Sequence, residues 1–210
     1  MTIPIKQKIS SDINRVAETQ FYLRPLLKNS LKSQVLTDAG KAQVGNFNNY
    51  LEYWEATFGR QFYDMSVAIR LGTVIENGLK HYYMGKKSHQ SLSDLKADPN
   101  YKQNIFQRIQ SWNGNDSAIN LYQIELSIDL TQNNHLTSMQ EAMLHRHLYA
   151  HNSGLIDDQY IQRLKTLTGT DLNGDPRMQG YPNDDVYWFS PLEKLSEFIE
   201  EARRFFEALP

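Results

Sequence analysis

Apolar residues in this chain recur at intervals of three and four along most of its length, and they alternate with polar residues almost nowhere. An α-helix turns once every 3.6 residues, so this spacing gathers the apolar side chains on one helix face, whereas a half-buried strand needs a period of two. The tetrapeptide VYWF at 186–189 is the only strand-like run in the sequence. We therefore predict an all-α protein.

Helix-breaking residues divide the pattern into segments. Pro25 closes the first segment, Gly59 ends the second, and Asp98, which precedes a proline, caps the fourth. The polar run 86–98 and the Gly/Pro/Asp-rich run 169–185 are predicted to be loops. The predicted helices are 9–24, 44–58, 60–84, 98–112, 116–130, 139–152, 157–167 and 190–209.

The domain organisation predicted from this pattern is simple. At 210 residues the chain is long enough to bury a sizeable core, and we see no internal repeat, no low-complexity tract and no sharp border in composition. We predict a main helical domain over 59–210, preceded by a helical N-terminal extension over 1–58.

Composition excludes several kinds of protein. The chain has no cysteine, which excludes disulfides, thiolate zinc sites and a cysteine nucleophile. A net charge of −2 argues against a protein that coats nucleic acid by bulk attraction, so any contact with RNA or DNA has to be a local site. No apolar run approaches the roughly 18 residues of a membrane span, and the N-terminus lacks the apolar middle of a secretory signal. We expect a cytoplasmic protein that does not engage a membrane.

One segment, LHRHLYAHNSGLIDD at 144–158, combines three of the six histidines with an arginine. Thr137 with Gln140, and Ser138 with Glu141, form overlapping capping-box pairs, so a helix is predicted to begin near residue 139. It should run to residue 152, where Asn-Ser-Gly supplies the left-handed residue of a C-cap. The histidines then lie in its last two turns, where exposed carbonyls favour a protonated imidazole and raise its pKa.

Arg146, His147 and His151 are the candidate catalytic residues of this helix. His147 and His151 are four residues apart and share a face, whereas Arg146 and His151 lie about 140° apart around the helix axis. The bare R-x4-H spacing is also compatible with chance. A metal site built on the two histidines, with His145 or Asp157 as further ligands, is another interpretation. It lacks the glutamate of H-E-x-x-H, and His145 points about 200° away from His147.

The run HRHLYAHNSGLIDDQYI at 145–161 resembles the signature of HEPN domains (higher eukaryotes and prokaryotes nucleotide-binding), in which an arginine, a polar residue and then a histidine lie near a helix end. Here these residues are Arg146, His147 and His151. The continuation, an asparagine and a glycine, an apolar pair, an acidic residue and Tyr-Ile, is similar to the run that follows the motif in prokaryotic defence-type members. The resemblance covers 136–167, fits the helices of 60–130 loosely and does not extend to the first 58 residues.

The resemblance implies a HEPN-like helical bundle and a metal-independent endoribonuclease without a cofactor, often a toxin or abortive-infection effector. Such enzymes act as homodimers in which the motifs of the two subunits face one another, and an antitoxin can neutralise them. His151 would transfer the proton, Arg146 would bind the phosphate, and His147 would orient His151 or donate a second hydrogen bond. Glu76 is a candidate to orient Arg146. The alternative function is a non-catalytic HEPN interaction module or a partner of a nucleotidyltransferase.

Overall fold

The computed structural model describes residues 4–35, 37, 47–56, 58–109, 116–188 and 192–210. Over these ranges the chain is all-α, as predicted, and its extended pairing is limited to two isolated bridges. The helices are α1 (Ile5–Glu18), α2 (Arg24–Ser33), α4 (Tyr50–Ala56), α5 (Phe58–Lys86), α6 (Leu92–Ala97), α7 (Ala118–Leu126), α8 (Leu136–Asn152), α9 (Asp158–Thr168) and α10 (Leu192–Glu207), with a π-helical turn η1 (Thr19–Leu23) and 3-10 turns η2 (Ile105–Gln107), η3 (Leu130–Gln132) and η4 (Pro176–Met178).

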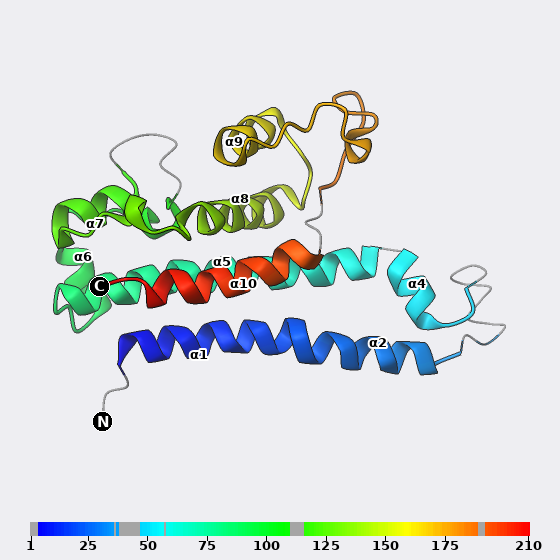
Figure 1. The fold of residues 1–210 in the computed structure, drawn as a ribbon, viewed down its shortest axis with the longest axis horizontal. Helices are drawn as coiled ribbons and strands as arrows, with labels where there is room; N and C mark the ends of the chain where they lie inside the picture. Colours follow the sequence, from blue (N-terminus) through cyan, green and yellow to red (C-terminus); the bar gives the residue numbers. More distant parts are fainter. Residues whose placement is uncertain (1–3, 36, 38–46, 57, 110–115, 189–191) are drawn as a thin grey trace.

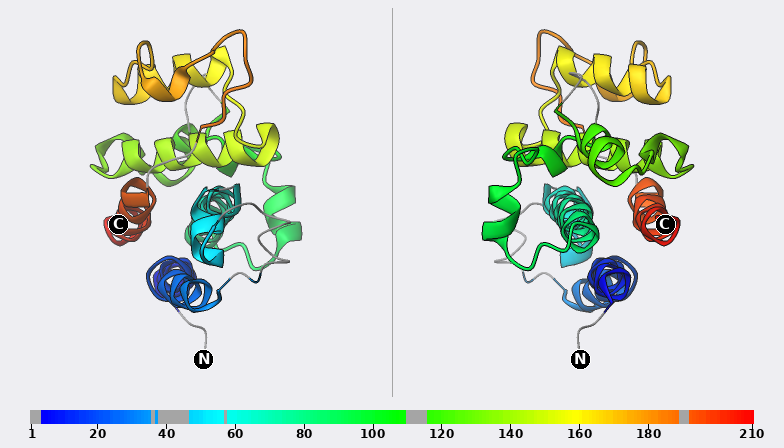
Figure 2. Two further views of the ribbon diagram at one scale, coloured as in Figure 1. Left: turned by 90° about the vertical axis from the view of Figure 1, so that its right-hand side faces the viewer. Right: turned by 90° about the vertical axis from the view of Figure 1, so that its left-hand side faces the viewer.

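The long helix α5 organises the fold. Figures 1 and 2 show α5 and α10 lying between α1 on one side and α8 on the other, with α9 outside α8. The apolar faces of these helices meet in one core. Its fully buried members include Ile13, Leu71, Ile75, Leu79, Met139, Met143 and Phe205. Within the described residues, no helix is both long enough and apolar enough to span a bilayer.

The N-terminal extension packs directly on the main helices. α1 contacts α5 and α10, and its residues Ile9, Ile13 and Val16 belong to the same core. Pro25 does not end the helical run, because the chain stays helical from α1 through η1 into α2, and Pro25 lies in the first turn of α2. Gly59 likewise does not end a helix, since it lies inside α5.

The segment from 98 to 130 departs most from the predicted pattern. The expected helix over 98–112 is wrong for the described residues 98–109, which form turns and η2, because Asn104 adopts a left-handed φ of 64°. The rest of that predicted helix lies outside the described residues. Ser117, and not Asp116, caps α7, since its hydroxyl accepts from the backbone N–H of Asn120 at 3.3 Å. α7 then ends at Ser127, with φ of 55°, before reaching Leu130.

One predicted loop and the one strand-like run also need correction. The run 86–98 contains α6, which is begun by a capping box between Ser91 and Asp94. The strand-like run at 186–189 contributes a single bridge, Tyr187 to Leu155, and its last residue lies outside the described part of the chain. The loop 169–185 is confirmed, apart from the short turn η4 within it.

Candidate active site

α8 carries the candidate residues and is held on three sides by α5, α9 and α10. It begins at Leu136, about one turn before the predicted start, and the predicted capping boxes do not form. Gln140 instead donates to the carbonyl of Ile109 at 3.1 Å, and Glu141 turns toward His145. The predicted C-terminus is confirmed: Asn152 is the last helical residue and Ser153 takes the left-handed conformation, with φ of 52°.

Arg146 lies flat against α5. Its Cγ would be 2.4 Å from a Cβ atom added at Gly72, so the absence of a side chain there makes room for the arginine stem. One turn further along α5, Glu76 Oε2 lies 3.6 Å from Arg146 Nη2. Gln107 Nε2 donates to the other oxygen of Glu76 at 3.2 Å. The ion pair and the glycine together fix where the guanidinium lies, with its side chain 14% exposed.

His147 and His151 contact one another at the solvent-exposed end of α8. Their ring centroids lie 4.6 Å apart, as expected for side chains on one helix face. The expectation that the helix end raises the pKa is wrong for His147. Burial of part of its ring, followed by the charges of His151, Arg163 and Arg146, lowers the pKa of His147, and Asp157 opposes the shift only partly. His147 therefore favours its neutral form near pH 7.

Arg163 lies near the exposed end of α8, and the sequence analysis did not identify it as part of the site. Gly154, with φ of 88°, lets the chain reverse after α8, and Asp157 caps α9 by accepting from the backbone N–H of Tyr160 at 2.7 Å. The other Asp157 oxygen accepts from Asn152 Nδ2 at 2.7 Å. This turn brings α9 back over α8 and places Arg163 within electrostatic reach of His147. No local sequence pattern predicts that Arg163 comes near His147, because this depends on the turn between α8 and α9.

His145 has a structural role. It is 3% exposed, its Nδ1 lies 3.0 Å from the Tyr160 hydroxyl, and its Nε2 lies 3.5 Å from Glu141 Oε1. Its ring also packs on Phe198, with centroids 5.6 Å apart. Lys194 lies 3.3 Å from the second Glu141 oxygen. Burial alone would raise the pKa of Glu141, but the hydrogen bond and charge of His145, together with Lys194, lower it.

The metal interpretation loses its extra ligands in this arrangement. His145 is turned into the core, and both oxygens of Asp157 already accept hydrogen bonds. Within the described ranges, no three side chains of histidine, aspartate or glutamate gather closely enough to hold a metal ion. A metal would have to be bound there by His147 and His151.

The site therefore combines a fixed guanidinium, a pair of exposed imidazoles and a second arginine. A guanidinium presents planar N–H donors that match a phosphate, and a neutral imidazole can accept a proton. This set of groups suits an anionic substrate from which a proton is removed.

A scan against models of protein families found no match, and searches of curated proteins and of solved structures found none either.

Proposed function

We propose that this chain is a metal-independent endoribonuclease with a HEPN-like helical bundle, and that Arg146, His147 and His151 form its catalytic site. The observation that carries the proposal is the position of Arg146, held by Gly72 and Glu76 on the same helix whose exposed end carries the two contacting histidines. The resemblance of 145–161 to the HEPN signature names the same three residues.

The chemistry of RNA cleavage needs few groups. RNA carries its own nucleophile, the 2′-hydroxyl, so the protein has to remove its proton, hold the reacting atoms in line and stabilise charge on the phosphoryl oxygens. His151 accepts the 2′-hydroxyl proton as the 2′-oxygen bonds to phosphorus. The bond from phosphorus to the 5′-oxygen breaks, that oxygen takes up a proton from water, and His151 returns its proton to water afterwards. The products are a 2′,3′-cyclic phosphate and a 5′-hydroxyl.

The remaining residues stabilise the charge on the phosphoryl oxygens or orient the side chains that act on the substrate. Arg146 donates hydrogen bonds to the phosphoryl oxygens, which a planar guanidinium does well. Glu76 is a positioning residue, since it contacts Arg146 and no reacting atom. His147, with its lowered pKa, remains available to accept a hydrogen bond and to orient the His151 ring that it contacts.

We propose that the site is completed in a homodimer. Arg146 and His151 are splayed by about 140° around α8, so a single helix does not easily direct both groups at one phosphate. A two-fold axis beside the exposed end of α8 would place Arg146 of one subunit opposite His151 of the other. RNA is then the substrate, and the neutralising partner is an antitoxin.

Growth of a host that expresses the chain tests this function. We expect expression to slow growth, and both Arg146→Ala and His151→Ala to restore it while the helical circular dichroism stays unchanged. Toxicity that persists in the folded double variant would contradict catalysis and would favour a non-catalytic interaction module or a nucleotidyltransferase partner.

A further inference from the structure

A polar cleft lies next to the candidate site, on the far side of Glu76. It has a volume of about 470 Å³, which is in the range of pockets that bind small molecules or single units of a polymer. Its walls come from α5, from α6 and from the turns that follow α6. The lining residues are Glu76, Lys80, Lys96, Tyr101, Gln103, Asn104 and Phe106.

The cleft continues the line of the candidate site along α5. Gly154, beyond the end of α8, lies near Met65, and Arg146 lies over Gly72, so α8 runs antiparallel to α5. Glu76 and then Lys80 follow at successive turns of α5, and Lys80 is about 12 Å along the helix axis from Gly72. The histidines therefore lie on one side of Arg146 and the cleft lies on the other. A strand crossing Arg146 from the histidines would enter the cleft.

The charges in the cleft favour an anion. Its one carboxylate, Glu76, is already paired with Arg146 and accepts a hydrogen bond from Gln107. Lys80 is half-buried and Lys96 is exposed, and neither makes an ion pair with a residue that the structure describes. Two lysines thus line the same cleft, and neither lies within 4 Å of a carboxylate oxygen that the structure describes. The backbone of a nucleic acid carries a negative phosphate at every nucleotide, so two successive phosphates can contact the two lysines.

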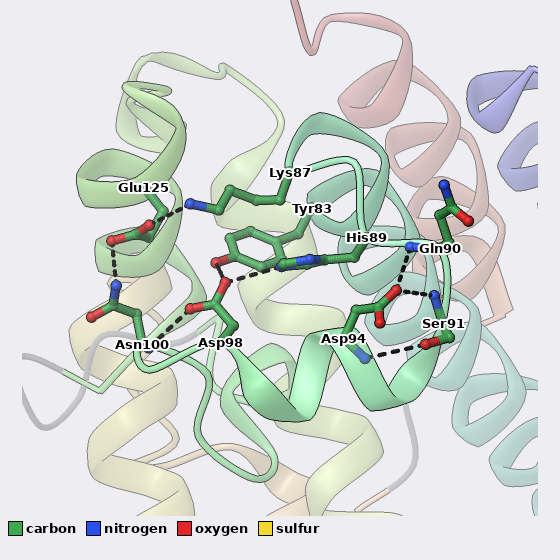
Figure 3. A network of polar contacts seen from close by, with 9 residues as sticks. All are labelled: Tyr83, Lys87, His89, Gln90, Ser91, Asp94, Asp98, Asn100 and Glu125. Carbon is green, nitrogen blue, oxygen red and sulfur yellow. Dashed lines mark hydrogen bonds and ion pairs between the residues drawn. The ribbon is translucent and has the colours of Figure 1, made fainter.

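Hydrogen bonds to Asp98 and Asn100 hold the far wall of the cleft in place. Asp98 lies between Lys96 and Tyr101 in the chain, and Figure 3 shows its carboxylate accepting from three directions. The Tyr83 hydroxyl donates at 2.6 Å, His89 Nε2 lies at 3.1 Å, and the backbone N–H of Asn100 donates at 2.9 Å. Asn100 is held in turn by Glu125 at 2.6 Å. These bonds fix the wall to α5 and α7.

The same wall offers an aromatic surface. Tyr101 lines the cleft, and its ring centroid lies 6.2 Å from that of Phe106, which is buried. An aromatic ring supported from behind and beside two lysines is the combination that binds single-stranded nucleic acid, since a base stacks on the ring while phosphates contact the cations.

We propose that this cleft binds the RNA strand on one side of the scissile phosphate, with Lys80 and Lys96 contacting backbone phosphates and Tyr101 stacking on a base. The inference rests on the proposed function for its substrate class, but it concerns binding and not the chemical step. It places the flanking nucleotides at α5 and α6, away from the histidines.

Binding of a 2′-O-methyl RNA oligonucleotide, which has no free 2′-hydroxyl to attack the phosphate, tests the cleft independently of cleavage. The full chain is compared with the double variant Lys80→Gln/Lys96→Gln. Loss of two phosphate contacts should weaken binding about tenfold at roughly 0.15 M salt and should reduce the slope of log K against log salt by about 1.4. The control Lys8→Gln/Lys32→Gln removes the same charge from α1 and α2, and it should change affinity less than twofold.

The outcomes separate the two proposals. Weakened binding in the cleft variant alone, with no cleavage of unmodified RNA by the parent chain, would support the cleft and overturn the nuclease. Equal affinity of both double variants would overturn the cleft, and so would failure of the parent chain to bind the oligonucleotide at all. A Tyr101→Leu variant should lose affinity without any change in the salt slope, because it removes stacking and no charge.

Discussion

The stem of Arg146 occupies the space beside Gly72 that any larger residue would need. A Cβ atom at residue 72 would lie 2.4 Å from Arg146 Cγ and 2.7 Å from its Cβ, so α5 and α8 would have to move apart. We expect Gly72→Ala to destabilise the protein by about 1–3 kcal/mol through overpacking, despite the better helix propensity of alanine. Urea unfolding measures the loss.

Gly85→Ala is the matched control for that substitution. Gly85 also lies in α5, but its added Cβ meets Cδ1 of Ile5, the end of a flexible side chain that can turn away. Gly85→Ala should therefore cost less stability and should leave RNA cleavage unchanged. If Gly72→Ala were as stable and as active as the parent chain, the arginine would not be held where we place it.

Glu76→Gln should reduce activity more than stability. The amide keeps the shape of the carboxylate and its contact with Gln107, but it removes the charge that faces Arg146 at 3.6 Å. We expect kcat/KM to fall about tenfold, equivalent to about 1.4 kcal/mol, with most of the loss in kcat. Glu200→Gln, which breaks the ion pair with Arg203 on α10, is the control and should not alter kcat.

The lowered pKa of His147 predicts a pH dependence of stability. A histidine whose pKa is lower in the folded than in the unfolded state binds fewer protons when folded, so the free energy of unfolding falls as pH drops below about 6.5, the unfolded value. His147→Asn should make the decline between neutral and acidic pH shallower than in the parent chain. Urea unfolding at several pH values measures it, and parallel profiles would show that the environment of His147 differs from the one described.

Much of the candidate site could be predicted from the sequence because its signals are local. The Asn-Ser-Gly stop, the Asp157 cap and the i, i+4 spacing of His147 and His151 each act within a few residues. Arg163 was missed because its approach depends on how α9 folds back. The helix expected over 98–112 was wrong because Asn104 takes a left-handed φ of 64°, although Asp98 does accept from the backbone N–H of Asn100 as a cap would.

Mixing two inactive variants tests the shared site. If Arg146 and His151 act across a dimer, a heterodimer of Arg146→Ala and His151→Ala has one intact site and one doubly damaged site. Random exchange makes about half of the dimers heterodimers, so the mixture should recover about a quarter of the parent activity. A mixture that exchanges subunits but stays inactive would place both residues in one subunit, and a fully active monomer would rule out the shared site.

The ends of cleaved RNA test the central claim most directly. The purified chain should cut RNA in excess EDTA and leave 2′,3′-cyclic phosphate or 3′-phosphate ends, because the attacking group is the 2′-oxygen and the groups that act on the phosphate and the proton are side chains, Arg146 and His151. His151→Ala and Arg146→Ala should abolish those ends. Cleavage that stops on chelation and returns with zinc, or products that carry 3′-hydroxyl ends, would contradict the account.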